Sequence, residues 1–502
     1  MKLTCAFALA LSFTTPCFAD VRLPKIFTSH AVLQREQPIH VWGWSEPGEA
    51  VSISLNGVTQ TSTGDRLGQW SIYLPPQSAG GPYQLVVAGT NRIVVDDVLI
   101  GDVWFASGQS NMEMPLRGFP GSAVVKNAEE EIRNANQPNL RLLLIPHKPS
   151  SFPLADFEGD VAWTACTPET AAKFSAVAYF FGREIAEKEH VAIGLIDSTW
   201  GGTPGEAWVS MDGLSRDASL MPIFATWTKM ADQQANIPAM LRAEKAEDEA
   251  ARQAHQPLPK HSWHPDPASY DPSWLFNGMV APATGYRIRG VIWYQGETNS
   301  ALERAPHYHK VFSTLIADWR RHWGEGEFPF LFTQISSFRS SPNEDWPLVR
   351  EAQLETLSLV NTGMAVTIDV GNPDNVHPSD KQTVGHRLAL AGRAVAYGEH
   401  IEFSGPLFRE TSVEEHAIRV WFTHAADGLA GKGGALAGFE IAGSDHRFCP
   451  AEARIDGQTV VATSPQVEHP LYVRYGWQNA PEVNLFNAAD LPASPFTSDI
   501  PR

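Results

Sequence analysis

The sequence predicts an α/β protein: a parallel sheet flanked by helices, with a small β domain at each end and a helical insertion. Two patterns predict this fold. Between residues 97 and 400, buried apolar runs alternate with amphipathic helix patterns, as in a parallel sheet covered on both faces. Before and after that region, short alternating runs are separated by turn residues, as in antiparallel β domains.

Residues 1–19 have the pattern of a signal peptide: Lys2, an apolar run from Ala6 to Phe13, and Cys17-Phe18-Ala19 as a small-x-small cleavage site. We therefore expect cleavage near Ala19 and an exported protein, periplasmic or extracellular. The run is too short to cross a bilayer, and no later stretch reaches the roughly 18 apolar residues that a spanning helix needs.

Composition narrows the class of partner. Hydrophobic residues make up 43% of the 502 residues and charged residues 19%, which is typical of a globular protein. The formal net charge of −18 repels polyanions, so we expect neither nucleic acid nor a membrane surface as a partner. After cleavage Cys166 and Cys449 remain, and the sequence leaves open whether they form a disulfide or two free thiols. It also leaves the oligomeric state open.

Residues 20–96 are expected to form an N-terminal, sandwich-like β domain. Asn56-Gly57 lies between two alternating runs and is a strong hairpin signal. Aromatic residues in this region offer a sugar-binding surface or core packing, and we favour core packing for Trp42, Trp44 and Trp70.

Residues 97–400 are expected to form the central domain. Its helices are marked by a Thr167 N-cap before Pro168, a stop near Gly324, and a capping box at Ser379 and Gln382. The buried strands are expected at Val98–Ala106, Leu140–Ile145, Val191–Ile196, Val291–Tyr294, Phe328–Ile335 and Met364–Ile368.

A helical insertion at about residues 211–275 interrupts the alternation, and residues 401–502 are expected to form the C-terminal β domain. The insertion carries His255, His261 and His264 without a regular ligand spacing, so we do not expect a metal there. Nothing else clusters as a ligand set. We therefore expect no metal and no cofactor.

Two polar segments at predicted strand ends have the parts of a nucleophile and its base. Ser110 follows the apolar run that ends at Ala106, and Asp374 and His377 precede the helix near Ser379. In such an arrangement the histidine takes the serine proton and the aspartate orients the imidazole. A turn serine, an unrelated surface pair and a metal-binding pair are the alternatives for these residues.

Two further strand ends carry potential hydrogen-bond donors. One is the glycine-rich turn at Gly201-Gly202, and the other includes Gln295, which has a side-chain amide. Acyl transfer requires donors aimed at a developing oxyanion, and these segments are suited to that role.

Taken together, these segments resemble the SGNH hydrolases and, within them, the sialate O-acetylesterase family, over nearly the whole chain after residue 19. The motifs that carry the resemblance are Gly108-Gln109-Ser110-Asn111-Met112, Gly201-Gly202-Thr203-Pro204, residues 275–282, Trp293-Tyr294-Gln295-Gly296-Glu297, Arg350-Glu351-Ala352-Gln353, Asp374-Asn375-Val376-His377-Pro378 and residues 491–496.

The resemblance implies an SGNH-type sheet, with Ser110 as nucleophile, His377 as base and Asp374 as orienter. It also implies an oxyanion hole made by the Ser110 N–H, Gly202 and the Gln295 side chain. Glu297 is expected to be structural and to pair with Arg350, with orientation of His377 as its alternative role.

The function implied is that of a secreted serine esterase that removes O-acetyl groups from carbohydrates, above all from O-acetylated sialic acid, through an acetyl-serine intermediate. An acetyl esterase acting on xylan or another plant polysaccharide is the alternative. A carbohydrate-binding protein on an inactive esterase scaffold is the third reading, although every catalytic residue type is present.

Overall fold

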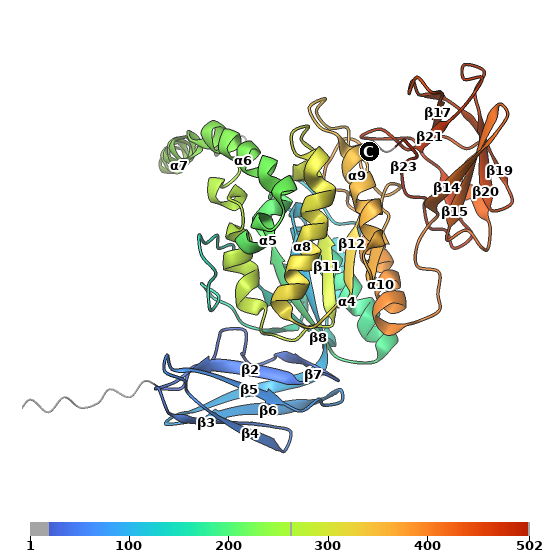
Figure 1. The fold of residues 1–502 in the computed structure, drawn as a ribbon. Coiled ribbons are helices and arrows are strands. Elements are labelled where there is room, and N and C mark those ends of the chain that lie inside the picture. Colours follow the sequence, from blue (N-terminus) through green and yellow to red (C-terminus); the bar gives the residue numbers. More distant parts are fainter. Residues whose placement is uncertain (1–19, 262–263, 500–502) are drawn as a thin grey trace, which may run out of the picture.

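The computed structural model describes residues 20–261 and 264–499. A helix-covered sheet forms the centre, one β domain lies at its lower end, and a second β domain lies at the upper right (Figure 1). The predicted mixed α/β fold, with a mostly parallel central sheet and extra β domains, is confirmed. The predicted signal peptide lies outside the described residues.

The central sheet has the strand order β13-β12-β11-β7-β10-β8-β9. Every pair is parallel except the one that joins β8 to the edge strand β9. Each of the six predicted buried runs overlaps one strand, because a sheet covered on both faces requires nearly continuous apolar sequence. The strands are β7 (Arg92–Gly108), β8 (Gln137–Leu144), β9 (Thr164–Cys166), β10 (Ile193–Thr199), β11 (Gly290–Tyr294), β12 (Phe330–Thr333) and β13 (Thr362–Ala365).

Helices cover both faces of this sheet, and two successive residues of β7 show it. Trp104 contacts Phe181 of α4 (Ala176–Glu189), whereas Phe105 contacts Trp319 of α8 (Tyr308–Trp323). Successive strand side chains point to opposite faces, so α4 and α8 lie on opposite sides. The other helices of this domain are α1 (Ser110–Glu113), α2 (Ala128–Arg133), α3 (Pro168–Ala171), α9 (Trp346–Glu355) and α10 (Lys381–Tyr397).

Helix boundaries were predicted in part. Thr167 caps α3 as expected. That helix ends at Ala171, and Ser175 caps a separate helix, α4. Helix α8 ends at Trp323, as the predicted stop near Gly324 implies, and its C-cap Gly324 has a left-handed conformation. The predicted capping box of α10 is wrong: Asp380, not Ser379, accepts the hydrogen bond, from the Thr383 N–H.

Strand β7 belongs to two domains at once. Its first half pairs with strands of the N-terminal domain and its second half with β10 and β11, so the predicted boundary at residue 96 falls inside one continuous strand. The Asn56-Gly57 turn joins β3 to β4 with positive φ at both residues, as its sequence predicts. The strands are β1 (Val32–Gln34), β2 (Ile39–Trp44), β3 (Ala50–Leu55), β4 (Val58–Thr63), β5 (Gln69–Leu74) and β6 (Gly80–Ala88).

The aromatic residues of the N-terminal domain mostly pack. Trp70 is buried, and the ring of Trp42 packs edge-on against Phe27 at 5.0 Å. Trp44 is half-buried, with the Arg22 guanidinium over its ring.

The helical insertion consists of α5 (Met211–Ser215), α6 (Met221–Gln234) and α7 (Ile237–Gln253), and α7 projects from the upper left of the molecule (Figure 1). His261 and His264 lie 3.0 Å from carboxylates of α7, those of Asp248 and Glu244 respectively. Within the described residues, no three His, Cys, Asp or Glu side chains are grouped so that they could hold a metal ion. The same part of the chain contains no helix with both the length and the apolar character needed to cross a membrane.

The C-terminal β domain has its own hydrophobic core and lies away from the N-terminal β domain, so the two do not form one body (Figure 1). Cys166 and Cys449 are both free thiols, which resolves the alternative left open by the sequence. The strands are β14 (Leu407–Glu414), β15 (Ala417–Thr423), β16 (Leu429–Gly431), β17 (Phe439–Ala442), β18 (Cys449–Pro450), β19 (Glu452–Asp456), β20 (Thr459–Thr463), β21 (Tyr472–Tyr475), β22 (Leu485–Asn487) and β23 (Phe496–Thr497).

Candidate active site

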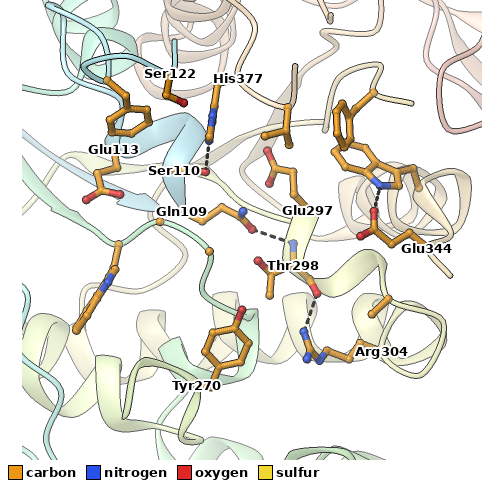
Figure 2. Close-up of a pocket in the computed structure, with 18 of the residues that line it drawn as sticks. Gln109, Ser110, Glu113, Ser122, Tyr270, Glu297, Thr298, Arg304, Glu344 and His377 are labelled. Atoms are coloured by element: carbon orange, nitrogen blue, oxygen red, sulfur yellow. Dashed lines mark hydrogen bonds between the residues drawn. The ribbon is translucent and has the colours of Figure 1, made fainter. Parts of the chain in front are cut away.

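A cavity of about 800 Å³ lies where the parallel strands end at their carboxyl edge. Four of the residues singled out in the sequence line it: Ser110, Glu297 and His377, which Figure 2 labels, and Gly202. Binding sites in parallel α/β sheets lie at this edge because the loops that follow the strands converge there. The cavity is therefore the candidate active site.

The nucleophile is carried on a tight strand-to-helix turn. Gly108 ends β7 with φ of 132°, and a Cβ at this position would lie 2.2 Å from the Tyr294 carbonyl oxygen, so only glycine fits. The Gln109 N–H donates to the same carbonyl oxygen, and Ser110 then opens α1. The turn holds the Ser110 hydroxyl at the cavity wall.

Ser110 and His377 form the expected pair. Ser110 Oγ lies 2.8 Å from His377 Nε2, within hydrogen-bond distance, although the two residues are 267 positions apart in the chain (Figure 2). Burial, together with the nearby Lys381 ammonium, lowers the pKa of His377 to about 4. At neutral pH the imidazole is therefore uncharged, which is the form that can accept the serine proton.

Asp374 does not contact the imidazole in this structure, so its expected role as orienter stays a prediction. Its side chain is 78% exposed, and its carboxylate accepts a hydrogen bond from Arg339 Nη1 at 2.8 Å. The reason is local: the loop folds through side-chain-capped turns, in which the Asp374 N–H donates to Asn372 Oδ1 and the His377 N–H donates to Asn375 Oδ1. These turns point His377 inward and Asp374 outward.

Two of the three expected oxyanion donors lie at the cavity. Gly202 has φ of 72° and, like Ser110, lines the wall. Within residues 20–261 and 264–499, the N–H groups of Ser110 and Gly202 donate to no other group, so both remain available.

Gln295, the expected third donor, lies elsewhere. It is completely buried beneath the site, where its Nε2 donates to the Thr203 carbonyl and to Asn299 Oδ1. Its amide therefore holds the fold and does not reach the cavity. Gln109 presents a side-chain amide instead. Its Oε1 accepts hydrogen bonds from the N–H groups of Gly296 and Thr298, which leaves Nε2 facing the cavity (Figure 2).

Glu297 is part of a buried polar chain beneath the pair, and not of an ion pair with Arg350 as expected. Asn111 Nδ2 donates to Glu297 Oε1 at 2.5 Å, and Lys381 Nζ donates to Asn111 Oδ1 at 2.5 Å. Burial raises the pKa of Glu297 and lowers that of Lys381 to about 7, while each charge partly offsets this effect on the other. Asn111 Nδ2 also donates to the carbonyl of Val376. These hydrogen bonds connect the loop that carries His377 to the turn that carries Ser110.

Arg350 is completely buried and donates only to backbone carbonyls of the described residues: those of Ile335, Ser336, Gln478 and Asn479. Its role is to hold loops together beside the cavity.

Among the polar residues around the Ser110–His377 pair, the sequence analysis missed Gln109, Asn111 and Lys381. Gln109 and Asn111 flank Ser110 in its motif, so that motif was the signal available for both. Lys381 opens an ordinary helix and carries no such signal.

Comparisons with known proteins agree with this geometry. Residues 258–393 match the family model described as carbohydrate esterase, sialic acid-specific acetylesterase. The chain is 31% identical to the sialate O-acetylesterase of Homo sapiens, over 95% of this chain and 92% of that protein. It is 33% identical to the same enzyme of Mus musculus, over 77% of this chain and 75% of that protein.

A solved structure is also similar. The crystal structure of a carbohydrate acetylesterase from Xanthomonas citri has 38% sequence identity and a TM-score of 0.82, with 96% of this chain and 100% of that chain covered. Similarity over nearly the full length, with the serine and histidine in hydrogen-bond contact, leads to one assignment. The chain belongs to the sialate O-acetylesterase family and is a carboxylic ester hydrolase.

Proposed function

We propose that the protein removes O-acetyl groups from carbohydrates through an acetyl-serine intermediate. The observation that carries this proposal is the 2.8 Å contact between Ser110 Oγ and His377 Nε2 at the wall of an open cavity. A serine hydroxyl with an uncharged imidazole beside it is the arrangement that activates a nucleophile for acyl transfer.

The reaction proceeds in two halves. Ser110 Oγ attacks the acetyl carbonyl carbon while its proton moves to His377 Nε2, and the N–H groups of Ser110 and Gly202 and the Gln109 amide stabilise the oxyanion. The C–O bond to the sugar then breaks, and the sugar oxygen takes the proton from His377. Water next attacks the acetyl-serine, with His377 again accepting and returning a proton, and acetate leaves.

In this proposal Asp374 leaves Arg339, and its loop turns the carboxylate toward the imidazole. An exposed ion pair such as the one with Arg339 is worth only about 0–1 kcal/mol, so releasing Asp374 costs little. The imidazolium that forms during the reaction is disfavoured by burial and by Lys381. A carboxylate three residues away on the same loop is suited to stabilise it, and we assign that role to Asp374.

For the sugar, we propose O-acetylated sialic acid, the substrate class in the names of the curated relatives. Arg304 supports this choice. Its guanidinium lies at the cavity wall over the Tyr270 ring, where Nη1 donates to the Thr298 carbonyl at 2.8 Å. A guanidinium suits the carboxylate of a sialic acid.

A neutral acetylated polysaccharide, such as acetylated xylan, is the second candidate, and a specific observation favours it. Glu113, Glu297 and Glu344 all line the same cavity. The charges of Glu113 and Glu344 repel an anionic sugar and leave a neutral one unaffected.

The test is hydrolysis of O-acetylated sialic acids and of acetylated xylan fragments, with Ser110→Ala as the inactive control. For sialate, Arg304→Gln should raise KM about 10- to 100-fold, since hydrogen bonds to charged groups are worth about 1.5–3 kcal/mol. Faster hydrolysis of the xylan fragments, with KM unaffected by Arg304→Gln, would instead select the neutral substrate. Hydrolysis of neither carbohydrate by a folded enzyme would refute the proposed function.

Export is part of the proposal, and sequencing the N-terminus of protein recovered outside the cytoplasm tests it.

A further inference from the structure

The loop between β12 and α9 forms the cavity wall opposite the catalytic pair. Phe338 and Glu344 line the cavity from this loop, and Trp346 lines it from the first position of α9. The Trp346 indole N–H donates to Glu344 Oε2 at 2.9 Å. Glu344 lies across the cavity from Ser110 and His377 (Figure 2). A substrate whose acetyl group reaches Ser110 would therefore extend its sugar toward this loop.

This wall is held by a residue of the C-terminal β domain, Asn479. Its Nδ2 donates to Ser340 Oγ at 2.7 Å and to the Glu344 backbone carbonyl at 3.2 Å. Its Oδ1 accepts from the backbone N–H of Trp346 at 3.1 Å. Its backbone carbonyl also accepts from the Phe338 N–H at 3.2 Å. One asparagine thus contacts the loop beside each of the three cavity-lining side chains.

Arg350 holds the turn at residues 478–479, which carries Asn479, through hydrogen bonds to its backbone carbonyls. From inside α9 it donates to the Gln478 carbonyl at 2.8 Å and to the Asn479 carbonyl at 2.7 Å, and its Nε donates to the Ile335 carbonyl at 3.0 Å. Because Arg350 is completely buried, these bonds are shielded from water. The turn at residues 478–479 is therefore fixed to the sheet, and the wall is fixed to the turn.

The rest of the C-terminal domain is docked on the same side of the sheet. Gln334 Nε2 donates to Ser494 Oγ at 2.8 Å, and the Thr497 N–H donates to Glu351 Oε2 at 3.2 Å. Both contacts are buried, so the domain is positioned by several bonds and not by Asn479 alone. Removal of the Asn479 side chain should loosen the wall without releasing the domain.

We propose that the C-terminal β domain is a substrate-recognition element and that Asn479 is its positioning residue, which holds Phe338, Glu344 and Trp346 against the sugar of an acetylated carbohydrate. The inference rests on the proposed function and adds to it. The acetyl group is handled by Ser110 and its neighbours, whereas affinity for the sugar depends on a wall that the C-terminal domain keeps in place.

Asn479→Ala tests this division, with an acetylated carbohydrate and an aryl acetate as substrates. KM for the carbohydrate should rise about 10-fold, the loss expected when one or two hydrogen bonds to the sugar are no longer made. The kcat/KM for the aryl acetate, which has no sugar, should change far less. Asn479→Asp keeps the acceptor for the Trp346 N–H and loses the two donated bonds, so it should give an intermediate KM.

Asn484→Ala is the matched control. Asn484 stabilises a turn of the same domain by donating to the carbonyls of Lys432 and Ala435, and this turn does not line the cavity. Its KM should equal that of the wild type. An unchanged carbohydrate KM in Asn479→Ala overturns the inference. So does an equal loss of kcat on both substrates, or the same rise of KM in Asn484→Ala, because each indicates a purely structural role. If the wild type cleaves the aryl acetate but no acetylated carbohydrate, the proposed function fails, and this inference fails with it.

Discussion

Asp374→Asn and Glu297→Gln separate the two carboxylates that could support His377, and the structure predicts different defects. Asp374 is exposed, so its loss should leave stability nearly unchanged. An opposite charge at close range shifts a pKa by about 1–3 units. This shift is worth about 1.4–4 kcal/mol for the imidazolium. We therefore expect Asp374→Asn to lower kcat roughly 10- to 10³-fold.

Glu297→Gln should act on stability instead. It removes the carboxylate that faces the buried Lys381 through Asn111. Loss of one partner of a buried charge pair destabilises a fold by about 3–5 kcal/mol. We expect the lower end, because Lys381, whose pKa is already lowered to about 7, can release its proton. Any fall in kcat should be smaller than that of Asp374→Asn.

The assay is kcat on an aryl acetate, measured beside denaturant unfolding of both variants. Arg339→Ala is the companion variant, since it removes only the competitor for Asp374, and it should leave kcat unchanged or raise it. If Glu297→Gln loses more kcat than Asp374→Asn and unfolds like the wild type, then Glu297 supports the histidine. The role assigned to Asp374 would then be wrong.

Three further predictions concern the rest of the chemistry. The kcat/KM should fall on acidification with an apparent pKa near 4, because His377 must be uncharged to act; the folded-state pKa is lowered, so stability should also decrease as the pH falls from about 6.5 toward that value. An acid limb near 6.5 in the pH–rate profile would contradict this. Gln109→Glu keeps the oxygen that accepts from Gly296 and Thr298 but loses the N–H, so kcat should fall about 10²- to 10³-fold, and wild-type kcat in the folded variant would exclude Gln109 as a donor. Incubation with a chelator should leave kcat unchanged, whereas a loss restored by one divalent ion would support metal binding at Asp374 and His377.

The strands could be predicted because their burial dictates composition. Both faces of β10 and β11 are covered, so each is a continuous apolar run that is visible in the sequence. The Gly108 turn was also visible, since a glycine between an apolar run and a polar motif signals a sharp change of direction. These local patterns placed Ser110 and His377 at the same edge of one sheet, and the structure brings them into contact.

Side-chain partners could not be predicted, because they depend on contacts between distant segments. Gln295 and Gln109 are both glutamines at strand ends. Thr203 and Asn299 accept hydrogen bonds from the Gln295 amide, whereas they do not contact the Gln109 amide. Likewise, Arg350 donates hydrogen bonds to carbonyls of the C-terminal domain that lie about 130 residues further along the chain. It does not pair with Glu297, which accepts a hydrogen bond from Asn111 instead. The direction of Asp374 follows from two turns whose geometry the sequence alone does not fix.

The most direct test of the account is to trap the intermediate. Wild-type enzyme is mixed with an acetyl ester, quenched in acid during turnover, digested and mapped by mass spectrometry. The account predicts one added acetyl group on the peptide that contains Ser110, absent in Ser110→Ala, and lost when turnover is allowed to finish. An acetyl group on another residue, or hydrolysis of the ester at the wild-type rate by folded Ser110→Ala, would contradict it.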